Sequence, residues 1–429
     1  MPAFTARPLS ACLRITVVLA ALSALLPMTA RADDCAFGPY RGPAGEIVAL
    51  SRPAPGAGPG ARYTFVDGRR GFLSDAGAPL ACEAGKLHAR GEAAAAAWTP
   101  VPMHATPTRF RSGDVTLNGM LLEPVGAERP PLVVYVHGSE KTSPIGLATQ
   151  YLFVAEGVAM FAYDKRGTAG SEGVYTQDFI TLAQDAANAG REARRLAGAR
   201  AGRFGYLGGS QGGWVAPLAA LQAGADFLEV GFPVVGTAIE QDRWQVDYQL
   251  LQEHGWGPEI LPKVHALTDA TGEVARSDFR AGMDRVEALK AAFAREPWLK
   301  DVDGQYSGGL LKGEVERMRD ESPKVTWEYA GLDAVRALRV PQLWVLAEDD
   351  DVAPSAPSLA RLQAIRREGT PIRAIVFPRT THGILRIEVD PATGRRRDLN
   401  VFAPGYFQVL ADFAWGRAHG AYGDGRWAE

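Results

Sequence analysis

Near the middle of the chain stands Tyr206-Leu207-Gly208-Gly209-Ser210-Gln211-Gly212-Gly213-Trp214, from which the architecture is read most directly. An apolar run, Phe204 to Leu207, precedes its centre, and a helix-compatible segment, Trp214 to Ala223, follows. Its Gly-x-Ser-x-Gly pattern is typical of a sharp strand-to-helix turn that exposes a serine and requires glycine where the backbone passes close by. Ser210 is therefore a candidate nucleophile, with Gly208 and Gly212 as the glycines of the turn. The pentapeptide alone also fits a glycine-rich turn without chemistry, so the rest of the chain has to decide.

The segments around this turn alternate between strand and helix patterns. Leu132 to Val136 and Val158 to Tyr163 are continuous apolar runs, which are typical of strands buried on both faces of a parallel sheet. From Phe179 to Leu196, apolar residues recur every three or four positions and form one helical stripe. This order predicts a doubly wound, mostly parallel α/β sheet with ligands outside the carboxyl ends of its strands.

The alternation is interrupted once and then resumes. Residues from about Glu240 to Val335 are charged, aromatic and mostly helix-compatible. We expect them to form a helical cap over the carboxyl edge of the sheet, with a peripheral decoration as the alternative. Strand patterns return at Gln342 to Leu346 and at Ile372 to Phe377.

The first 32 residues have the pattern of a secretory signal. Arg7 and Arg14 precede or flank an apolar run, Ile15 to Leu26, and Ala30-Arg31-Ala32 offers a cleavage site. The apolar run is shorter than the roughly 20 residues that span a bilayer, so no stable membrane anchor is expected. We expect cleavage near Ala32 and a periplasmic or secreted mature chain.

The next 70 residues are rich in glycine, proline and alanine and contain short β-like runs. Cys35 and Cys82, the two cysteines left after removal of the signal, would meet an oxidising compartment, so a disulfide is expected and two buried free thiols are the alternative. Asp67-Gly68 between two of the β-like runs indicates a hairpin with a type I′ turn. The alanine tract at residues 93–97 is read as a connection. These patterns divide the chain into a signal peptide (1–32), a small β-rich N-terminal unit (33–105), a first core part (106–239), a helical cap insertion (240–336) and a second core part (337–429).

Composition excludes some partners. The 429 residues include 46 Lys and Arg against 49 Asp and Glu, a net charge of -3. Because the chain has no excess of positive charge, it is not expected to bind nucleic acid or an anionic membrane surface.

A serine nucleophile needs a base and a group that orients the base, and both occur downstream in the expected order. His382 follows the strand run that ends at Phe377 and precedes a glycine, which makes it the candidate general base. Three consecutive aspartates follow the strand run that ends at Leu346. Asp350 is the chosen acid, and Asp349 is the main competitor.

The negative charge that develops on the substrate carbonyl needs two backbone N–H donors. Gln211, directly after Ser210, is placed to supply one of them. Ser139, in His137-Gly138-Ser139 after a core strand, is placed to supply the other. His137 is expected to order this loop.

Together with Tyr163-Asp164-Lys165-Arg166-Gly167 and His382-Gly383, these motifs resemble the α/β-hydrolase superfamily over about residues 108–412. More narrowly, the chain is similar to bacterial exported serine esterases related to the acyltransferase and dienelactone-hydrolase-like branches. The resemblance implies hydrolysis of a small-molecule carboxylic ester through an acyl-enzyme, with no metal and no organic cofactor. It also supports Asp350, because the acid of the family commonly lies four residues before a proline.

Two positions depart from the pattern of the superfamily. Glu140 stands where a small residue is common, and its charge is expected to disfavour acidic acyl groups. Ala347 replaces a common glycine. Asp164 and Arg166 are expected to form a structural pair below the site.

Two other functions remain open. A serine peptidase or amidase of the same fold shares the chemistry, but the N-terminal unit is too short for the propeller lid of oligopeptidases, which favours esters. An inactive exported binding module is the alternative from a different class, and the presence of every catalytic element speaks against it.

Overall fold

The protein is represented by a computed structural model that describes residues 35–53, 60–91, 97–391 and 396–428. The predicted signal peptide, its cleavage site near Ala32 and most of the alanine tract lie outside these residues. None of the described helices is long and apolar enough to cross a membrane.

The centre of the molecule is a mixed sheet whose order is β19-β15-β14-β13-β12-β10-β11-β9-β8 within the described residues. The six strands from β15 to β11 in this order are parallel to their neighbours, and β19, β9 and β8 add antiparallel edges. The predicted doubly wound α/β sheet is therefore confirmed. The strands are β8 (Met103–Ser112), β9 (Val115–Pro124), β10 (Leu132–Val136), β11 (Ala159–Tyr163), β12 (Phe204–Gly209), β13 (Phe227–Gly231), β14 (Gln342–Ala347), β15 (Ile372–Phe377) and β19 (Arg426–Ala428).

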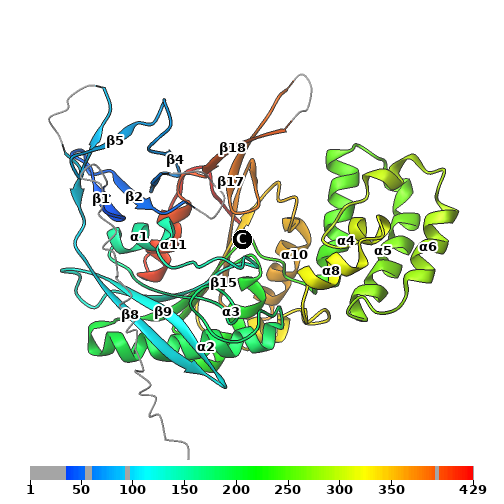
Figure 1. The fold of residues 1–429 in the computed structure, drawn as a ribbon, viewed down its shortest axis with the longest axis horizontal. Coiled ribbons are helices and arrows are strands. Elements are labelled where there is room, and N and C mark those ends of the chain that lie inside the picture. Colours follow the sequence, from blue (N-terminus) through cyan, green and yellow to red (C-terminus); the bar gives the residue numbers. More distant parts are fainter. Residues whose placement is uncertain (1–34, 54–59, 92–96, 392–395, 429) are drawn as a thin grey trace, which may run out of the picture.

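Helices cover both faces of this sheet because the side chains of each strand alternate between them. Val134 of β10 packs in the core formed with α2 and α3, whereas Val133 packs in the core formed with α1 and α11. Figure 1 shows these two pairs of helices on opposite sides of the strands. The helices of the core are α1 (Ala148–Ala155), α2 (Phe179–Ala197), η1 (Gly198–Arg200), α3 (Gly212–Ala223), α9 (Leu332–Ala337), α10 (Ser355–Arg367) and α11 (Tyr406–Ala414).

The N-terminal region forms a second, antiparallel sheet of order β4-β3-β2-β1-β7, which packs on α1. A hairpin of β5 and β6 lies beside it, and a disulfide joins Cys35 to Cys82 in β5. The expected hairpin at Asp67-Gly68 is present, but of these two residues only Gly68 has a positive φ, so its turn is not type I′. The strands are β1 (Gly38–Arg41), β2 (Ile47–Ser51), β3 (Arg62–Phe65), β4 (Arg70–Phe72), β5 (Leu80–Glu83), β6 (Lys86–Ala89) and β7 (Thr99–Pro100).

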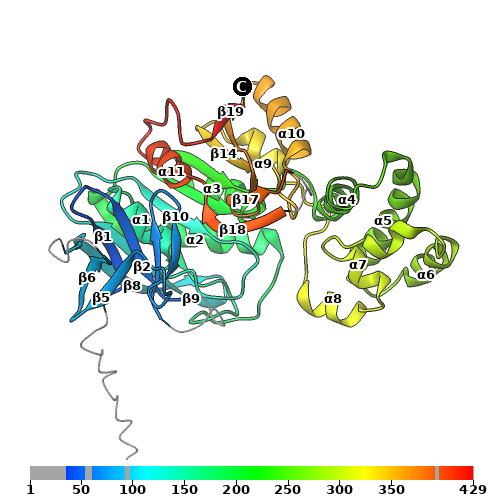
Figure 2. The same cartoon turned by 90° about the horizontal axis from the view of Figure 1, so that it is seen from above.

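The segment between β13 and α9 is helical and has an apolar core of its own. We call the helices from α4 to α8 the cap, and Figure 2 shows them set to one side of the main sheet. The elements are α4 (Ala238–Tyr248), η2 (Gln249–Glu253), η3 (Pro258–Ile260), α5 (Leu261–Arg276), α6 (Met283–Ala292), η4 (Pro297–Asp301), α7 (Ser307–Leu311) and α8 (Val315–Glu321).

A small sheet after β15 was not anticipated from the sequence. It consists of β16 (Thr380–Thr381), β17 (Leu385–Val389) and β18 (Arg396–Phe402). Because β16 immediately precedes His382, this sheet helps to fix the loop that carries the histidine.

Candidate active site

Ser210 lies on the turn between β12 and α3 with φ of +52°, a conformation that side-chain-bearing residues rarely adopt. The glycines on either side are explained by close approaches. A Cβ atom on Gly208 would overlap the backbone of Gly212, and one on Gly212 would overlap the carbonyl oxygen of Val136 in β10. The turn is therefore strained, tightly packed and possible only with glycine at both positions.

Ser210, His382 and Asp350 come together at the carboxyl edge of the main sheet, although up to 172 positions separate them along the chain. The Nε2 atom of His382 is 3.0 Å from the Oγ atom of Ser210. Its Nδ1 atom is 3.1 Å and 3.0 Å from the two carboxylate oxygens of Asp350. One imidazole thus bridges the hydroxyl and the carboxylate.

The buried carboxylate of Asp350 is held by its own loop. Its Oδ1 atom accepts hydrogen bonds from the backbone N–H groups of Val352, at 3.0 Å, and Ala353, at 2.7 Å. The neighbouring aspartates are occupied differently: the backbone N–H of Asp349 donates to Thr380, and the carboxylate of Asp351 accepts from the hydroxyl of Thr381. Asp350 is thus the aspartate of the three that meets the histidine.

The environment of His382 favours its protonated form. Burial alone would lower the pKa of His382, but the charge and hydrogen bond of Asp350 outweigh it and raise this pKa above its ordinary value. The ring of Phe232 packs edge-to-face with the imidazole, with 5.0 Å between the ring centroids, and restricts its movement. Such an imidazole is suited to accept a proton and remain charged briefly.

Ser139 and Gln211 line the same cavity as Ser210 and His382, a space of about 400 Å³ between the sheet edge and the cap. Among the described residues, none accepts a hydrogen bond from the backbone N–H of Ser139 or of Gln211. Both donors are therefore free to serve a ligand. In the described part of the chain, no three His, Cys, Asp or Glu side chains are grouped so that they could hold a metal ion.

Sequence reasoning missed Lys165, which lies directly below these donors. Its buried Nζ atom donates to the carbonyl oxygen of Gly138 and, at 2.7 Å, to the Oε1 atom of Gln211. Burial lowers the pKa of Lys165 to about 7. Its position two residues after β11, a strand that ends at the same sheet edge as β12, is the signal that could have identified it.

A second missed residue, Gln177, links this region to the cap. The side-chain amide of Gln211 donates to Gln177 at 3.0 Å, and the amide of Gln177 donates to the carbonyl oxygen of Glu321 in α8 at 2.7 Å. A chain of polar contacts therefore runs from Lys165 to the cap.

The expected pair of Asp164 and Arg166 is wrong. Arg166 instead forms a two-point ion pair with Asp185 of α2, with both nitrogen to oxygen distances at 2.7 Å. Asp164 accepts hydrogen bonds from the side chain of Asn118, at 2.8 Å, and the backbone of Gly170, at 3.0 Å. The two side chains diverge because the chain turns away from the sheet directly after β11.

The comparison with protein families gives one match. A model described as "X-Pro dipeptidyl-peptidase (S15 family)" matches residues 89–383, a range that includes Ser210, Asp350 and His382. Among curated proteins, no match was found.

Several solved structures match the chain at low sequence identity. An acylaminoacyl peptidase of Pyrococcus horikoshii is 18% identical with a TM-score of 0.41, and the aligned region covers 79% of this chain but only 44% of that one. An esterase of Pyrococcus furiosus is 14% identical with a TM-score of 0.41, covering 65% and 84% of the two chains. A proline iminopeptidase of Mycobacterium smegmatis is 15% identical with a TM-score of 0.42, covering 73% and 99%.

Proposed function

Because this chain belongs to the X-Pro dipeptidyl-peptidase (S15) family and is a serine hydrolase with the α/β-hydrolase fold, we propose that it cleaves carboxylic esters through an acyl-enzyme on Ser210. The observation that carries the proposal is the bridging imidazole, with Nε2 at 3.0 Å from Ser210 and Nδ1 at 3.0 Å from Asp350. This geometry is that of a nucleophile, a general base and its orienting acid.

In the first half of the reaction, the Oγ atom of Ser210 attacks the ester carbonyl carbon while Nε2 of His382 accepts the hydroxyl proton. The carboxylate of Asp350 stabilises the imidazolium that forms. The negative charge on the carbonyl oxygen is stabilised by the backbone N–H groups of Ser139 and Gln211. His382 then donates its proton to the departing alcohol, which leaves an acyl group on Ser210.

In the second half, water takes the place of the alcohol. His382 accepts a proton from this water as it attacks the acyl carbon, and then returns a proton to Ser210 as the carboxylic acid departs. No residue beyond the same three side chains and two N–H donors is needed, which makes the cycle self-contained.

Peptide or amide cleavage is the second candidate, favoured by the description of the matching family. Glu140 lines the cavity that contains Ser210, and its carboxylate is suited to hold the free ammonium group of a peptide. The N-terminal region argues against peptide cleavage, because it forms a small sheet and a hairpin and is too short for the propeller lid of oligopeptidases. Esters therefore remain the first choice.

A substrate panel on the purified chain tests this proposal. Short-chain p-nitrophenyl esters and an Ala-Pro p-nitroanilide share a chromophore type and differ in the bond that is cleaved. We expect a higher kcat/KM for the esters, with turnover absent in Ser210→Ala. A higher kcat/KM for the anilide would favour the peptidase instead.

We further propose that the protein acts in the periplasm or outside the cell. The disulfide between Cys35 and Cys82 supports this, because disulfides persist in oxidising compartments. Mass spectrometry of the protein purified from an exporting bacterial host should give an N-terminus near Asp33. An intact Met1 or a reduced cysteine pair would contradict the proposal.

A further inference from the structure

A second cavity, of about 360 Å³, lies on the other side of the nucleophile turn, between the N-terminal sheet and the core. Its core wall includes Gly208 and Gly209, which directly precede Ser210, and Gly383, which directly follows His382. Glu140 lines both this cavity and the one that contains Ser210. We call the second space the arginine cavity, for the residues of its opposite wall.

The register of the N-terminal sheet builds that wall. Ser51 of β2 pairs with Arg62 of β3, and Thr64 of β3 pairs with Arg70 of β4. Since paired residues and residues two apart share a face of a sheet, these four side chains form one patch, and all four line the cavity. Arg52, directly after β2, adds a third guanidinium group.

The positive charge of this wall has no carboxylate partner in the described protein. No ion pair among the described residues involves Arg52, Arg62 or Arg70, and the buried Nε atom of Arg62 has no hydrogen-bond partner there. Arg70 donates to the carbonyl and side-chain oxygens of Asn400, which are neutral. Burial and the nearby charge of Arg62 lower the pKa of Arg70 to about 10. An anion in the cavity would relieve this repulsion.

The first turn of α1 lines the same space. Leu147, Ala148 and Thr149 line the cavity, and Leu147, at the N-cap of α1, offers no side-chain cap. The first turn of α1 also contains no acidic residue. The N-terminus of a helix attracts negative charge, so its field adds to that of the three guanidinium groups.

We propose that the arginine cavity is a subsite for a carboxylate group carried by the substrate whose ester is cleaved at Ser210. The carboxylate would accept paired hydrogen bonds from Arg62 and Arg70, since the planar guanidinium matches the geometry of a carboxylate. This inference rests on the proposed ester hydrolysis and names the substrate class: half-esters of dicarboxylic acids.

Glu140 does not cancel this charge. Burial would raise the pKa of Glu140, but the nearby side chain of His137 and the backbone lower it to about 2, so it is ionised. Its single negative charge lies 3.6 Å from Nδ1 of His137, and three arginines line the same cavity. The sequence led us to expect that Glu140 disfavours acidic acyl groups. We now propose instead that the protein prefers acyl groups that carry a carboxylate.

Binding can be measured without turnover. Succinate and its neutral analogue succinamide are titrated by calorimetry into the Ser210→Ala protein at low ionic strength. We expect succinate to bind and succinamide not to bind, and the added double change Arg62→Gln and Arg70→Gln to weaken succinate binding by about tenfold or more. Arg69→Gln is the matched control, because Arg69 is exposed and pairs with Asp67. Equal binding of both probes, no binding of either, or no effect of the double change would overturn the subsite.

Selection is measured with the wild-type catalytic serine. The mono-p-nitrophenyl esters of succinic, glutaric and adipic acid are compared with their methyl-capped counterparts, which lack the charge. At least one free acid should exceed its capped partner in kcat/KM by about tenfold. The ratio of the two kcat/KM values, free acid over capped ester, should fall towards one in Arg62→Gln and in the more exposed Arg52→Gln. Because a loss of folded protein lowers both values equally, it leaves this ratio unchanged. A ratio near one in the unaltered protein, with both esters turned over, would overturn the substrate assignment while leaving ester hydrolysis intact. An absence of all turnover would instead contradict the proposed function.

Discussion

The carboxyl edge of the main sheet and the cap are built in opposite ways. At the sheet edge, Lys165, Ser210, Asp350 and His382 come from distant parts of the chain, and each directly follows a different strand or its turn. The cap is a continuous segment with its own apolar core and its own polar network. The difference teaches that the catalytic geometry depends on strand register, whereas the cap folds around its own core and supplies none of the three catalytic side chains.

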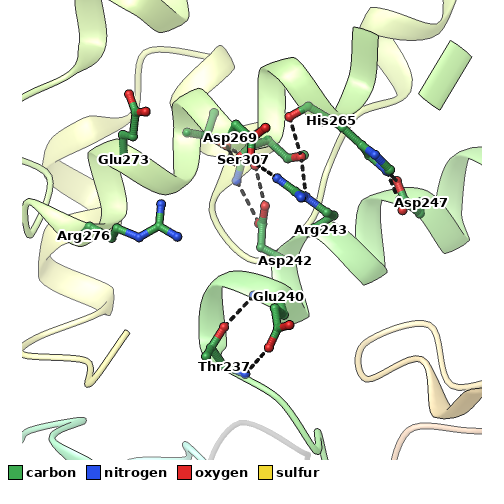
Figure 3. A network of polar contacts seen from close by, with 12 residues as sticks. Thr237, Glu240, Asp242, Arg243, Asp247, His265, Asp269, Glu273, Arg276 and Ser307 are labelled. Atoms are coloured by element: carbon green, nitrogen blue, oxygen red, sulfur yellow. Dashed lines mark hydrogen bonds and ion pairs between the residues drawn. The ribbon is translucent and has the colours of Figure 1, made fainter. Parts of the chain in front are cut away.

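The internal network of the cap surrounds Asp242 of α4. This buried carboxylate accepts hydrogen bonds from the backbone of Tyr306 and Ser307 and from the hydroxyl of Ser307, as Figure 3 shows for Asp242 and Ser307. Thr271 of α5 shares that hydroxyl. The contacts join α4, α5 and the start of α7 within the cap. Separate contacts link the cap to the sheet edge: one runs through Gln177, and in another the side-chain amide of Gln241 in α4 donates to the carbonyl oxygen of Val352, in the loop of Asp350, at 3.2 Å.

The largest effect is expected at the nucleophile. Ser210→Ala removes the atom that forms the acyl-enzyme, so kcat for p-nitrophenyl acetate should fall by about 10⁶-fold. Circular dichroism should show an unchanged fold, because the smaller side chain fits the same turn. If the variant kept kcat within tenfold of the unaltered protein, Ser210 would not be the nucleophile.

The next effect is expected at the orienting acid. Asp350→Asn keeps the shape but holds His382 in the wrong tautomer, so kcat should fall by about 10⁴-fold. The base must be neutral, so activity rises with pH through the pKa of His382. Because Asp350 raises that pKa, the acid limb of kcat/KM should lie above about pH 6.5 in the unaltered protein and move lower in the variant. Identical limbs in both proteins would show that this carboxylate does not act on the imidazole.

A smaller effect is expected at Lys165, whose contacts with Gly138 and Gln211 position the segments that carry the N–H donors of Ser139 and Gln211. Lys165→Met leaves the carbonyl of Gly138 without its donor, so the loop should shift and kcat should fall by about 10²-fold with little change in KM. Lys141→Met, a change at an exposed lysine in the same loop region, is the control. Equal kcat values for the two variants would refute a positioning role.

The smallest effect on activity is expected in the cap. Asp242→Ala leaves buried donors without an acceptor and should destabilise the cap by about 3 kcal/mol, seen by calorimetry as an earlier unfolding transition. Turnover of p-nitrophenyl acetate should change by less than tenfold. The matched change on the same helix, Asp247→Ala, breaks a partly exposed pair with His265 and should cost under about 1 kcal/mol. If a cap variant abolished turnover of p-nitrophenyl acetate while the core stayed folded, catalysis at the sheet edge would depend on the cap, and the distinction between the two regions would be wrong.

The sequence predicted the sheet edge well where a functional residue follows a strand with a strong apolar pattern. Ser210 and His382 could be identified in this way, because β12 has no charged residue and β15 is apolar except for Arg373. Asp350 was the chosen acid and is the carboxylate that contacts His382, but the strand pattern left Asp349 as a competitor, since the rotation of the loop after β14 decides which carboxylate meets the histidine.

Other parts depended on information that no local pattern carries. Lys165 was missed because its side chain turns back under the loop of Gly138, a direction set by tertiary packing. The patch of Arg62 and Arg70 required the pairing register of three short strands, which their sequences do not specify.

Labelling with a fluorophosphonate, followed by mass spectrometry of the tryptic peptides, tests the central claim most directly. The reagent reacts with a serine only when a neighbouring base activates it. We predict a single adduct on Ser210, absent in Ser210→Ala and strongly reduced in His382→Ala. An unlabelled Ser210 in the folded protein, or an adduct that persists in Ser210→Ala, would contradict the account.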